Sequence, residues 1–175
     1  MVARTVICAG LAEQRELPAI LELQQANRVQ SADGFVTVVH TLEILEAMQQ
    51  QLPHVVARSE GGALAGYALS MAPSCRELLP ILEPMFARLD ARKSRLGRYY
   101  VMGQICVAHS FRGSGVFDAL YAEHRSRFAA THDCLVTEIS TRNPRSLRAH
   151  ARVGFVEEER YRDATDEWIV VALRF

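Results

Sequence analysis

Residues 107–120 read VAHSFRGSGVFDAL, and this stretch decides how the rest of the chain is interpreted. A strand-like run ends at Val107, a turn with two glycines follows, and an amphipathic helix begins near Phe117. Backbone N–H groups in such a turn, with the positive end of the helix dipole behind them, form a binding site for an anion. Residues 112–117 are therefore predicted to hold a diphosphate without a metal ion.

Length and charge limit the classes of protein to which the chain can belong. With 175 residues it is expected to fold as a single domain, 1–175, whose core needs no disulfides. Twenty basic and twenty acidic residues give a formal net charge of zero, so no overall field would attract nucleic acid or an anionic membrane. No signal-peptide pattern and no apolar run of roughly 18–20 residues is present, so the expected location is the cytoplasm.

The four cysteines show neither C-x-x-C spacing nor histidines at the spacing of metal ligands. Their mostly apolar neighbours predict buried free thiols, and no metal site is expected. These residues are Cys8, Cys75, Cys106 and Cys134.

Hydrophobic periodicity predicts strands and helices along the whole chain. Gly61 and Gly62 set a β-hairpin between 54–58 and 64–71, and Asn143 caps a helix that ends at Gly154. Further strands are predicted at 5–9, 99–107, 135–139, 155–161 and 167–173, and further helices at 17–27, 42–51, 76–96 and 117–128. A strand–helix–strand unit with hairpins on both sides favours a mixed sheet covered by helices.

Two common phosphate-binding loops do not match residues 107–120. A nucleoside triphosphatase loop needs a lysine and a hydroxyl residue after its last glycine, but Val116 and Phe117 follow Gly115. A dinucleotide-binding fold needs a third glycine where Asp118 stands, and it begins with a βαβ unit rather than a hairpin.

The remaining pattern, a hydrophobic strand followed by Arg-x-x-Gly-x at residues 112–116 and a helix, resembles the acetyl-coenzyme A loop of the GCN5-related N-acetyltransferase (GNAT) superfamily. A second motif strengthens the resemblance: Asn143, Ser146, His150, Gly154 and Phe155 resemble the superfamily's closing motif. The two motifs and the hairpin cover residues 55–175, and residues 5–51 fit the family's opening strand and helices.

The resemblance implies an α/β (α+β) fold with a mixed, mostly antiparallel sheet of about six to seven strands flanked by helices. The fourth and fifth strands would splay apart and leave a V-shaped slot for the pantetheine arm of acetyl-CoA, the acyl donor. Backbone groups beside the slot, the loop and the closing motif would then bind acetyl-CoA. The implied residues are Ile105, Cys106, Val107, Arg112, Gly113, Ser114, Gly115, Val116, Phe117, Asn143 and Ser146.

Two residues are candidates for proton transfer. Many relatives carry tyrosine where this chain has His150, and we predict that His150 protonates the departing thiolate, since its unperturbed pKa of about 6.5 suits neutral pH. Glu138 could accept the proton of the incoming amine, although a one-residue change of register would turn it to solvent. Cys106 suggests an acyl-cysteine, but no activating partner is visible, and direct attack in a ternary complex is the expected route.

Phe117 departs from the family pattern, which has glycine or alanine at this position, so the loop geometry is expected to differ there. Residues 27–40 would line the acceptor pocket, where Asp33 could bind an amine or simply form a turn. The helix 76–96 would cover the same pocket, or it could make a homodimer contact. A small-molecule primary amine is the favoured acceptor. A protein N-terminus or lysine, and a non-catalytic acyl-CoA sensor, remain as alternatives.

Overall fold

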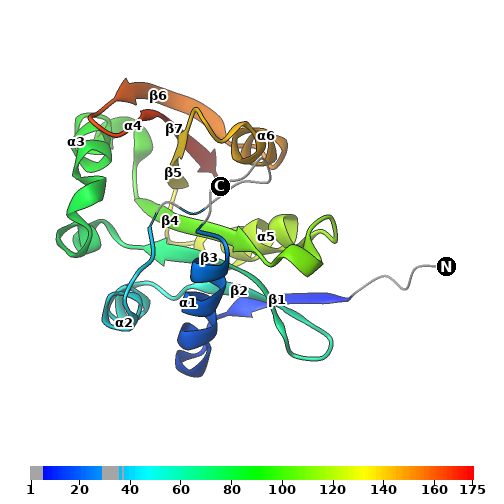
Figure 1. Ribbon diagram of the computed structural model, residues 1–175. Helices are drawn as coiled ribbons and strands as arrows, with labels where there is room; N and C mark the ends of the chain where they lie inside the picture. Colours follow the sequence, from blue (N-terminus) through cyan, green and yellow to red (C-terminus); the bar gives the residue numbers. More distant parts are fainter. Residues whose placement is uncertain (1–5, 29–35, 37) are drawn as a thin grey trace.

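The computed structural model describes residues 6–28, 36 and 38–175, which form a seven-stranded sheet with helices on both faces (Figure 1). The strands are β1 (Ile7–Leu11), β2 (Val55–Ser59), β3 (Leu64–Met71), β4 (Tyr99–Val107), β5 (Cys134–Ser140), β6 (Val156–Arg162) and β7 (Glu167–Arg174). The α-helices are α1 (Leu17–Ala26), α2 (Leu42–Gln51), α3 (Glu83–Ala91), α4 (Lys93–Leu96), α5 (Val116–Phe128) and α6 (Pro144–Arg152). Short 3-10 helices are η1 (Gln14–Glu16), η2 (Pro73–Leu78), η3 (Pro80–Leu82) and η4 (His109–Phe111).

The strands follow the order β1-β2-β3-β4-β5-β7-β6 across the sheet. Within the described residues β4 and β5 are the one parallel pair, and the other neighbours are antiparallel. Helix α5 provides the crossover that a parallel pair requires. The predicted mixed, mostly antiparallel sheet is therefore confirmed.

Each face of the sheet is covered by its own helices. Leu17 and Ile20 of α1, with Leu45 of α2 and Phe86 of α3, pack into one buried cluster. Leu120 of α5 belongs to a second cluster on the other face, against which the α6 side of the molecule also packs (Figure 1). The sheet is thus the middle layer of three, and its central strands are shielded from water on both sides.

Strands β4 and β5 separate along their length. They pair over three residues, from Tyr99 opposite Cys134 to Val101 opposite Val136. Beyond this point β4 stays paired with β3 up to Val107, and β5 stays paired with β7 up to Ser140. The register of β3 against β4 also shifts between Leu69 and Ser70, so β4 carries an extra residue that bends it. The predicted V-shaped splay is confirmed.

The local start and stop signals of α6 act as its sequence suggests. The Asn143 side chain accepts a hydrogen bond of 3.2 Å from the N–H of Ser146, and proline occupies the first turn. Gly154 follows the helix with a φ of 103°, a left-handed conformation that favours glycine. These signals fix where α6 begins and ends, and its beginning at Asn143 lies beside the splay between β4 and β5.

Three expectations need correction. The single helix predicted at 76–96 is wrong: η2 and η3 precede two shorter helices, α3 and α4, because Leu79 before Pro80 has a φ of −133° and cannot continue a helix into proline. The first strand begins at Ile7 and extends to Leu11 rather than ending at residue 9. Cys8 is exposed because it lies on an edge strand, whereas the other three cysteines are buried free thiols.

Candidate active site

The turn that follows β4 presents main-chain N–H groups to solvent. Gly113 and Gly115 have φ values of 79° and 85°, left-handed conformations that other residues rarely adopt. They turn the chain into α5, whose first N–H groups, those of Val116 and Phe117 among them, have no acceptor within the helix. The dipole of a 13-residue helix adds partial positive charge at this end. The turn therefore has the components of an anion site.

A glycine on β3 lets this turn pack closely against the sheet. A Cβ atom at Gly66 would lie 2.8 Å from the carbonyl oxygen of Cys106 and 2.8 Å from Cγ1 of Val116. Such contacts are too short for any side chain, so residue 66 fixes how near the start of α5 comes to β3 and β4.

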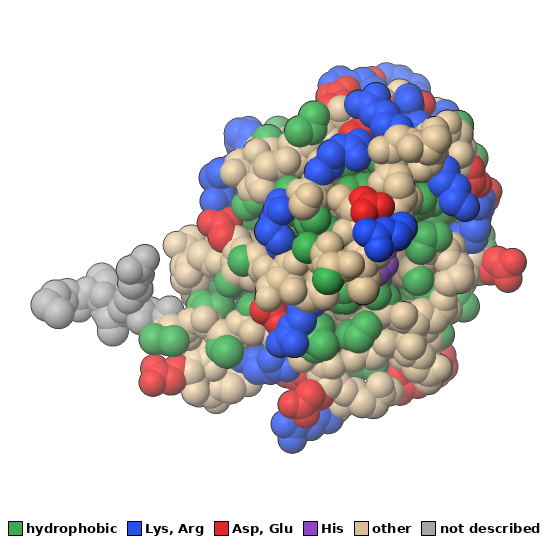
Figure 2. All heavy atoms as spheres, turned by 180° about the vertical axis from the view of Figure 1, so that it is seen from behind, with side chains coloured by type: hydrophobic (Ala, Val, Ile, Leu, Met, Phe, Trp, Pro, Cys, Tyr) green, Lys and Arg blue, Asp and Glu red, His purple; other side chains and the backbone are tan. Residues whose placement is uncertain are grey.

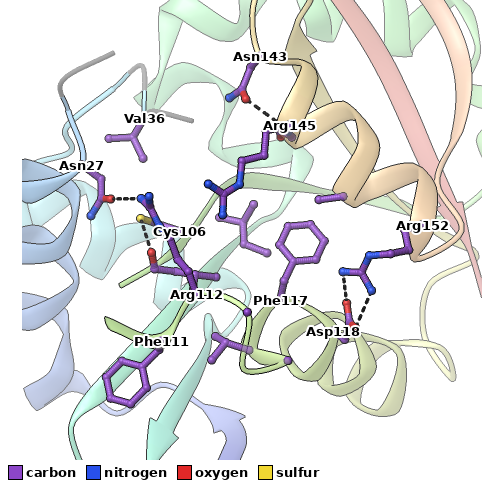
Figure 3. A pocket seen from close by; sticks show the side chains of 17 residues that line it. Asn27, Val36, Cys106, Phe111, Arg112, Phe117, Asp118, Asn143, Arg145 and Arg152 are labelled. Atoms are coloured by element: carbon purple, nitrogen blue, oxygen red, sulfur yellow. Dashed lines mark hydrogen bonds and ion pairs between the residues drawn. The ribbon is translucent and has the colours of Figure 1, made fainter. Parts of the chain in front are cut away.

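The turn borders a cavity of about 510 Å³, which we call the loop cavity (Figure 3). Its walls come from β4, the turn, the start of α5 and the first turns of α6. Ten of the eleven residues predicted to bind acetyl-CoA line it: Ile105, Cys106, Val107, Arg112, Gly113, Gly115, Val116, Phe117, Asn143 and Ser146. Ser114 does not, because its hydroxyl turns back to donate a hydrogen bond of 2.6 Å to the carbonyl of Phe111.

Arginine side chains give the loop cavity a positive lining. Arg112 donates a hydrogen bond of 2.9 Å to the side-chain oxygen of Asn27, so it supports the wall rather than pointing to bulk water. Arg152 forms two hydrogen bonds, of 2.6 and 2.7 Å, with Asp118, which tie α6 to α5. Arg145 extends from α6 toward the space between Arg112 and Phe117 (Figure 3). An anion entering the cavity meets guanidinium groups as well as main-chain amides.

The splay between β4 and β5 forms a second, narrow cavity of about 80 Å³, which we call the slot. Ile105, Asn143 and Ser146 line both the slot and the loop cavity, so the two spaces adjoin. His150 faces the slot from α6. Three residues of the predicted closing motif, Asn143, Ser146 and His150, therefore meet at the slot.

His150 is 1% exposed and held at both ring nitrogens. Nδ1 lies 2.8 Å from the carbonyl oxygen of Ser146, and Nε2 lies 2.7 Å from the hydroxyl of Tyr121. Because a carbonyl can only accept, Nδ1 carries the proton and Nε2 accepts from Tyr121. The rings of Phe117, Tyr121 and Phe155 surround it within 5.5 Å between centroids.

Burial lowers the pKa of His150 to about 4, which corrects the expected value near 6.5. The ring is neutral at neutral pH, so the predicted role of His150 as the acid that protonates the thiolate is not supported, and its one N–H proton is directed at the Ser146 carbonyl. Phe117 causes part of this burial, since it fills the space beside the imidazole instead of leaving the gap of a small residue. Burial also lowers the pKa of three other histidines to about 4, 4 and 3; these are His40, His54 and His124.

A third space, about 450 Å³, opens at the other end of the slot, and we call it the far cavity. Gln104, Thr137 and Glu138 line both the slot and the far cavity, so they stand where the two meet. Its other walls include η3, the start of α3 and the turn between β6 and β7, with Val38, His40 and Arg142. Asp33, a candidate for amine binding, lies outside the described residues.

Glu138 faces this junction rather than bulk solvent, which settles the register that the sequence left open. Burial raises the pKa of its carboxyl group to about 7, and a hydrogen bond from the Tyr161 hydroxyl partly opposes the rise. The Arg88 guanidinium stacks 4.1 Å from the centre of the Tyr161 ring and holds that ring in place. A carboxylate with a pKa near neutrality can both accept and release a proton.

The neighbouring side chains at the junction have fixed hydrogen bonds. Gln104 accepts from the hydroxyl of Tyr67 at 2.5 Å and donates to the carbonyl of Val38 at 2.7 Å. Burial raises the pKa of the Cys106 thiol to about 11, so this thiol is protonated at neutral pH. Cys106 therefore lacks the thiolate that a covalent acyl-enzyme route requires.

The sequence interpretation missed Tyr161, Tyr121 and Arg145. Tyr161 lies two strands away from Glu138 in the sheet, and nothing local to either residue indicates that they meet. Tyr121 lies within the predicted helix 117–128, but nothing in the sequence indicates that its hydroxyl reaches His150. Arg145 could have been found, because the residue after a capping asparagine and proline sits on the first turn of a helix facing the loop.

Other kinds of site find no support in the described part of the chain. Residues 6–28, 36 and 38–175 contain no group of three His, Cys, Asp or Glu side chains arranged to hold a metal ion. No described helix is long and apolar enough to cross a membrane. On the face seen in Figure 2, basic and acidic side chains are interspersed, unlike the basic stripe that nucleic acid requires.

No protein-family model matches the sequence, and no curated protein is significantly similar to it. Solved structures are similar along almost the whole chain. The ribosomal-protein-S18-alanine N-acetyltransferase from Escherichia coli has a TM-score of 0.70 at 14% identity, covering 97% of this chain and 94% of that one. The chain has the GNAT fold.

Two further similar structures are of enzymes that are named for small-molecule substrates. A GNAT superfamily phosphinothricin acetyltransferase from Sinorhizobium meliloti, in complex with AcCoA, has a TM-score of 0.66 at 16% identity and covers 98% of this chain and 88% of its own. A polyamine N-acetyltransferase from Drosophila melanogaster has a TM-score of 0.71 at 13% identity and covers 97% of this chain and all of its own, 100%. The GNAT fold of this chain thus occurs with several acceptor classes.

Proposed function

We propose that this protein is an acetyl-CoA-dependent N-acetyltransferase that transfers an acetyl group to the primary amine of a small molecule. The observation that carries the proposal is the continuity of three spaces: an anion-binding loop cavity, a narrow slot and a far cavity with a carboxylate at its entrance. A transferase with two substrates needs two pockets that meet at one point, and the slot is that point.

The residues of the loop cavity fit coenzyme A. The amides of Gly113, Gly115 and Val116 would hold the diphosphate, with Arg112 and Arg145 adding positive charge. Between Ile105 and Val107 the β4 backbone forms no ladder with β5 within the described residues, and an extended amide chain would pair with it on that side. When bound there, acetyl-CoA supplies an activated acetyl thioester.

His150 would serve the departing sulfur. The Nδ1 atom of its neutral ring lies 2.8 Å from the carbonyl oxygen and 3.2 Å from the hydroxyl of Ser146, a residue that lines both the loop cavity and the slot. The Tyr121 hydroxyl fixes the ring orientation from the other side. We assign His150 as the group that positions Ser146, whose hydroxyl donates a hydrogen bond to the thiolate. The thiolate then takes its proton from the nitrogen of the attacking amine, which must lose a second proton to become the amide.

Glu138 would serve the amine. An amine attacks as the neutral base, so one proton must leave the ammonium form, and the Glu138 carboxylate stands at the junction where the far cavity meets the slot. A pKa of about 7 leaves about half of the carboxyl groups ionised at pH 7. The amine then attacks the acetyl carbon directly, since Cys106 is protonated.

The test measures release of the CoA thiol that depends on added amine, and detects the acetylated amine by mass spectrometry. Glu138→Gln is expected to lose most of this activity, whereas Glu157→Gln, an exposed carboxylate on β6, is the matched control and is expected to keep it. Tight binding of acetyl-CoA with no thiol release from any amine would indicate a sensor and refute the transferase.

A further inference from the structure

The loop cavity and the far cavity, at the two ends of the slot, carry opposite charges. The charged side chains that line the loop cavity are three arginines and one aspartate, which leave an excess of positive charge. The far cavity is instead lined by three carboxylates and one arginine, together with His40, which is neutral because burial lowers its pKa to about 4. The carboxylates belong to Glu138, Asp163 and Asp166, and the arginine is Arg142. The far cavity therefore favours a cationic ligand.

One pair of these charges cancels within the protein. Arg142 forms an ion pair of 2.8 Å with Asp166, and the Ser140 hydroxyl donates a hydrogen bond of 2.5 Å to the same carboxylate. The excess negative charge therefore belongs to Glu138 and Asp163. Burial is the main cause that raises the pKa of Glu138, and the negative charge of Asp163 adds to the rise. The two carboxylates are thus near enough to repel each other, and a ligand with two positive charges would relieve this repulsion.

Asp163 is held in place by uncharged donors and can still bind a cation. Its Oδ1 atom accepts from the hydroxyl and N–H of Thr165, at 2.6 and 2.7 Å, and from the N–H of Asp166 at 2.9 Å. Its Oδ2 atom accepts one hydrogen bond, of 3.0 Å, from the indole N–H of Trp168. The Thr165 hydroxyl and the other donors lower the pKa of Asp163 to about 2, so the group is ionised at neutral pH. Because each carboxylate oxygen has about two lone pairs, Oδ2 can accept a further bond from an ammonium group.

The same cavity offers contacts for a hydrocarbon chain. Trp168 lines the slot as well as the far cavity and bonds to Asp163, so this side chain connects the junction at Glu138 with Asp163. Leu79 and Leu82 add apolar surface from the η3 side of the cavity. A ligand with an ammonium group at each carboxylate can place its methylene groups against these side chains.

We propose that the acceptor is an alkyl diamine, with the amine that is acetylated at Glu138 and a second ammonium group at Asp163. This inference rests on the proposed acetyltransferase function and names its substrate class. The N–C bond of the amide forms and the C–S bond of the thioester breaks. Glu138 takes one proton from the attacking nitrogen, and the thiolate takes the second. The ammonium group at Asp163 keeps its proton and its charge.

Three amines of equal chain length test this assignment. Glu138 lies on β5 and Asp163 follows β6, and β7 separates these two strands by about 10 Å, so a long diamine is the probe. Hexamethylenediamine carries a second ammonium group where aminohexanol has a hydroxyl and hexylamine has a methyl end. At pH 9 Glu138 is ionised and the diamine still carries two charges. We expect kcat/KM for the diamine to exceed that for hexylamine by about fivefold or more, and aminohexanol to resemble hexylamine.

A pair of variants assigns the effect to Asp163. Asp163→Asn removes the charge with little change of shape and is expected to lower the kcat/KM ratio of diamine to hexylamine by about fivefold. Asp90→Asn is the matched control, because Asp90 is an exposed carboxylate on α3 outside the three cavities. It is expected to leave the ratio unchanged. A loss of folded protein lowers both rates alike and does not alter the ratio.

The outcomes separate this inference from the proposed function. Equal kcat/KM values for the diamine and hexylamine, or a ratio that Asp163→Asn leaves unchanged, would overturn the diamine assignment while supporting acetyl transfer. A peptide with a free N-terminus acetylated better than every amine of the series would also overturn it. If acetyl-CoA binds and no compound is acetylated, the proposed transferase function fails, and the acceptor assignment fails with it.

Discussion

Removing the Tyr161 hydroxyl should move the acidic limb of the pH–rate profile upward. In the wild type this limb of kcat/KM is expected near pH 7, the value to which burial raises the pKa of Glu138. Tyr161 donates a hydrogen bond to the carboxylate form, so Tyr161→Phe removes a stabilising interaction of that form. A hydrogen bond to a charged group contributes about 1.5–3 kcal/mol. One pKa unit corresponds to about 1.4 kcal/mol, so loss of half of this contribution or more raises the pKa of Glu138 by about one unit.

The expected change is large enough to measure. With a pKa near 8, about one-tenth of the carboxyl groups are ionised at pH 7 instead of about half, so kcat/KM falls about fivefold at pH 7 and recovers near pH 9. Tyr99→Phe makes the same chemical change at a buried residue of β4 outside the three cavities and should leave the limb in place. An unshifted limb, or a uniform loss at every pH, would refute the role of Tyr161 and of Glu138 as the base.

Three further predictions concern the loop, His150 and the fold. Gly115→Ala should strain the turn and weaken acetyl-CoA binding about tenfold or more, as measured by calorimetry. Gly62 has a similar φ of 80° but lies in the β2–β3 hairpin, so Gly62→Ala should leave the affinity unchanged. Equal affinities in both variants would contradict the loop assignment. His150→Phe should lower kcat about a hundredfold with little change in acetyl-CoA affinity, and, because its pKa is lowered to about 4, the wild type should show no descending limb near pH 6.5; unchanged turnover would remove His150 from the mechanism. The four buried histidines have pKa values lowered to about 3–4, so they contribute stability that is fully present above pH 6.5 and is lost as the pH falls toward 4; the raised pKa of Glu138 opposes this loss in part. The free energy of unfolding in urea should therefore drop by about 3–6 kcal/mol from pH 7 to pH 5. A constant value would show that these side chains are hydrated.

The parts of the fold that the sequence predicted well are those with local causes. Glycines that adopt left-handed conformations at 113 and 115, the cap at Asn143 and the stop at Gly154 each act within a few residues of themselves. The strand 99–107 and the helix 42–51 were predicted with their observed bounds for the same reason. The loop cavity, which depends on these elements, was therefore predictable.

The parts that failed depend on contacts between distant residues. Whether Glu138 faces a cavity is decided by strand register, and its pKa depends on Tyr161 two strands away. The lowered pKa of His150 depends on three aromatic rings brought together by α5, α6 and the start of β6. Hydrophobic spacing also suggested one helix across 76–96, entered through a proline-rich turn, but the structure has two 3-10 helices around Pro80 before the shorter helices α3 and α4.

The central claim is that main-chain amides of the turn after β4 hold the diphosphate of acetyl-CoA. Titration of acetyl-CoA followed by the amide resonances of Gly113, Gly115 and Gly62 tests it directly. The two loop glycines should shift with one common, saturable binding curve, Gly62 should not move, and ATP and NAD should have much weaker effects. Binding of acetyl-CoA that leaves the resonances of Gly113 and Gly115 unchanged, or no binding at all, would contradict the account.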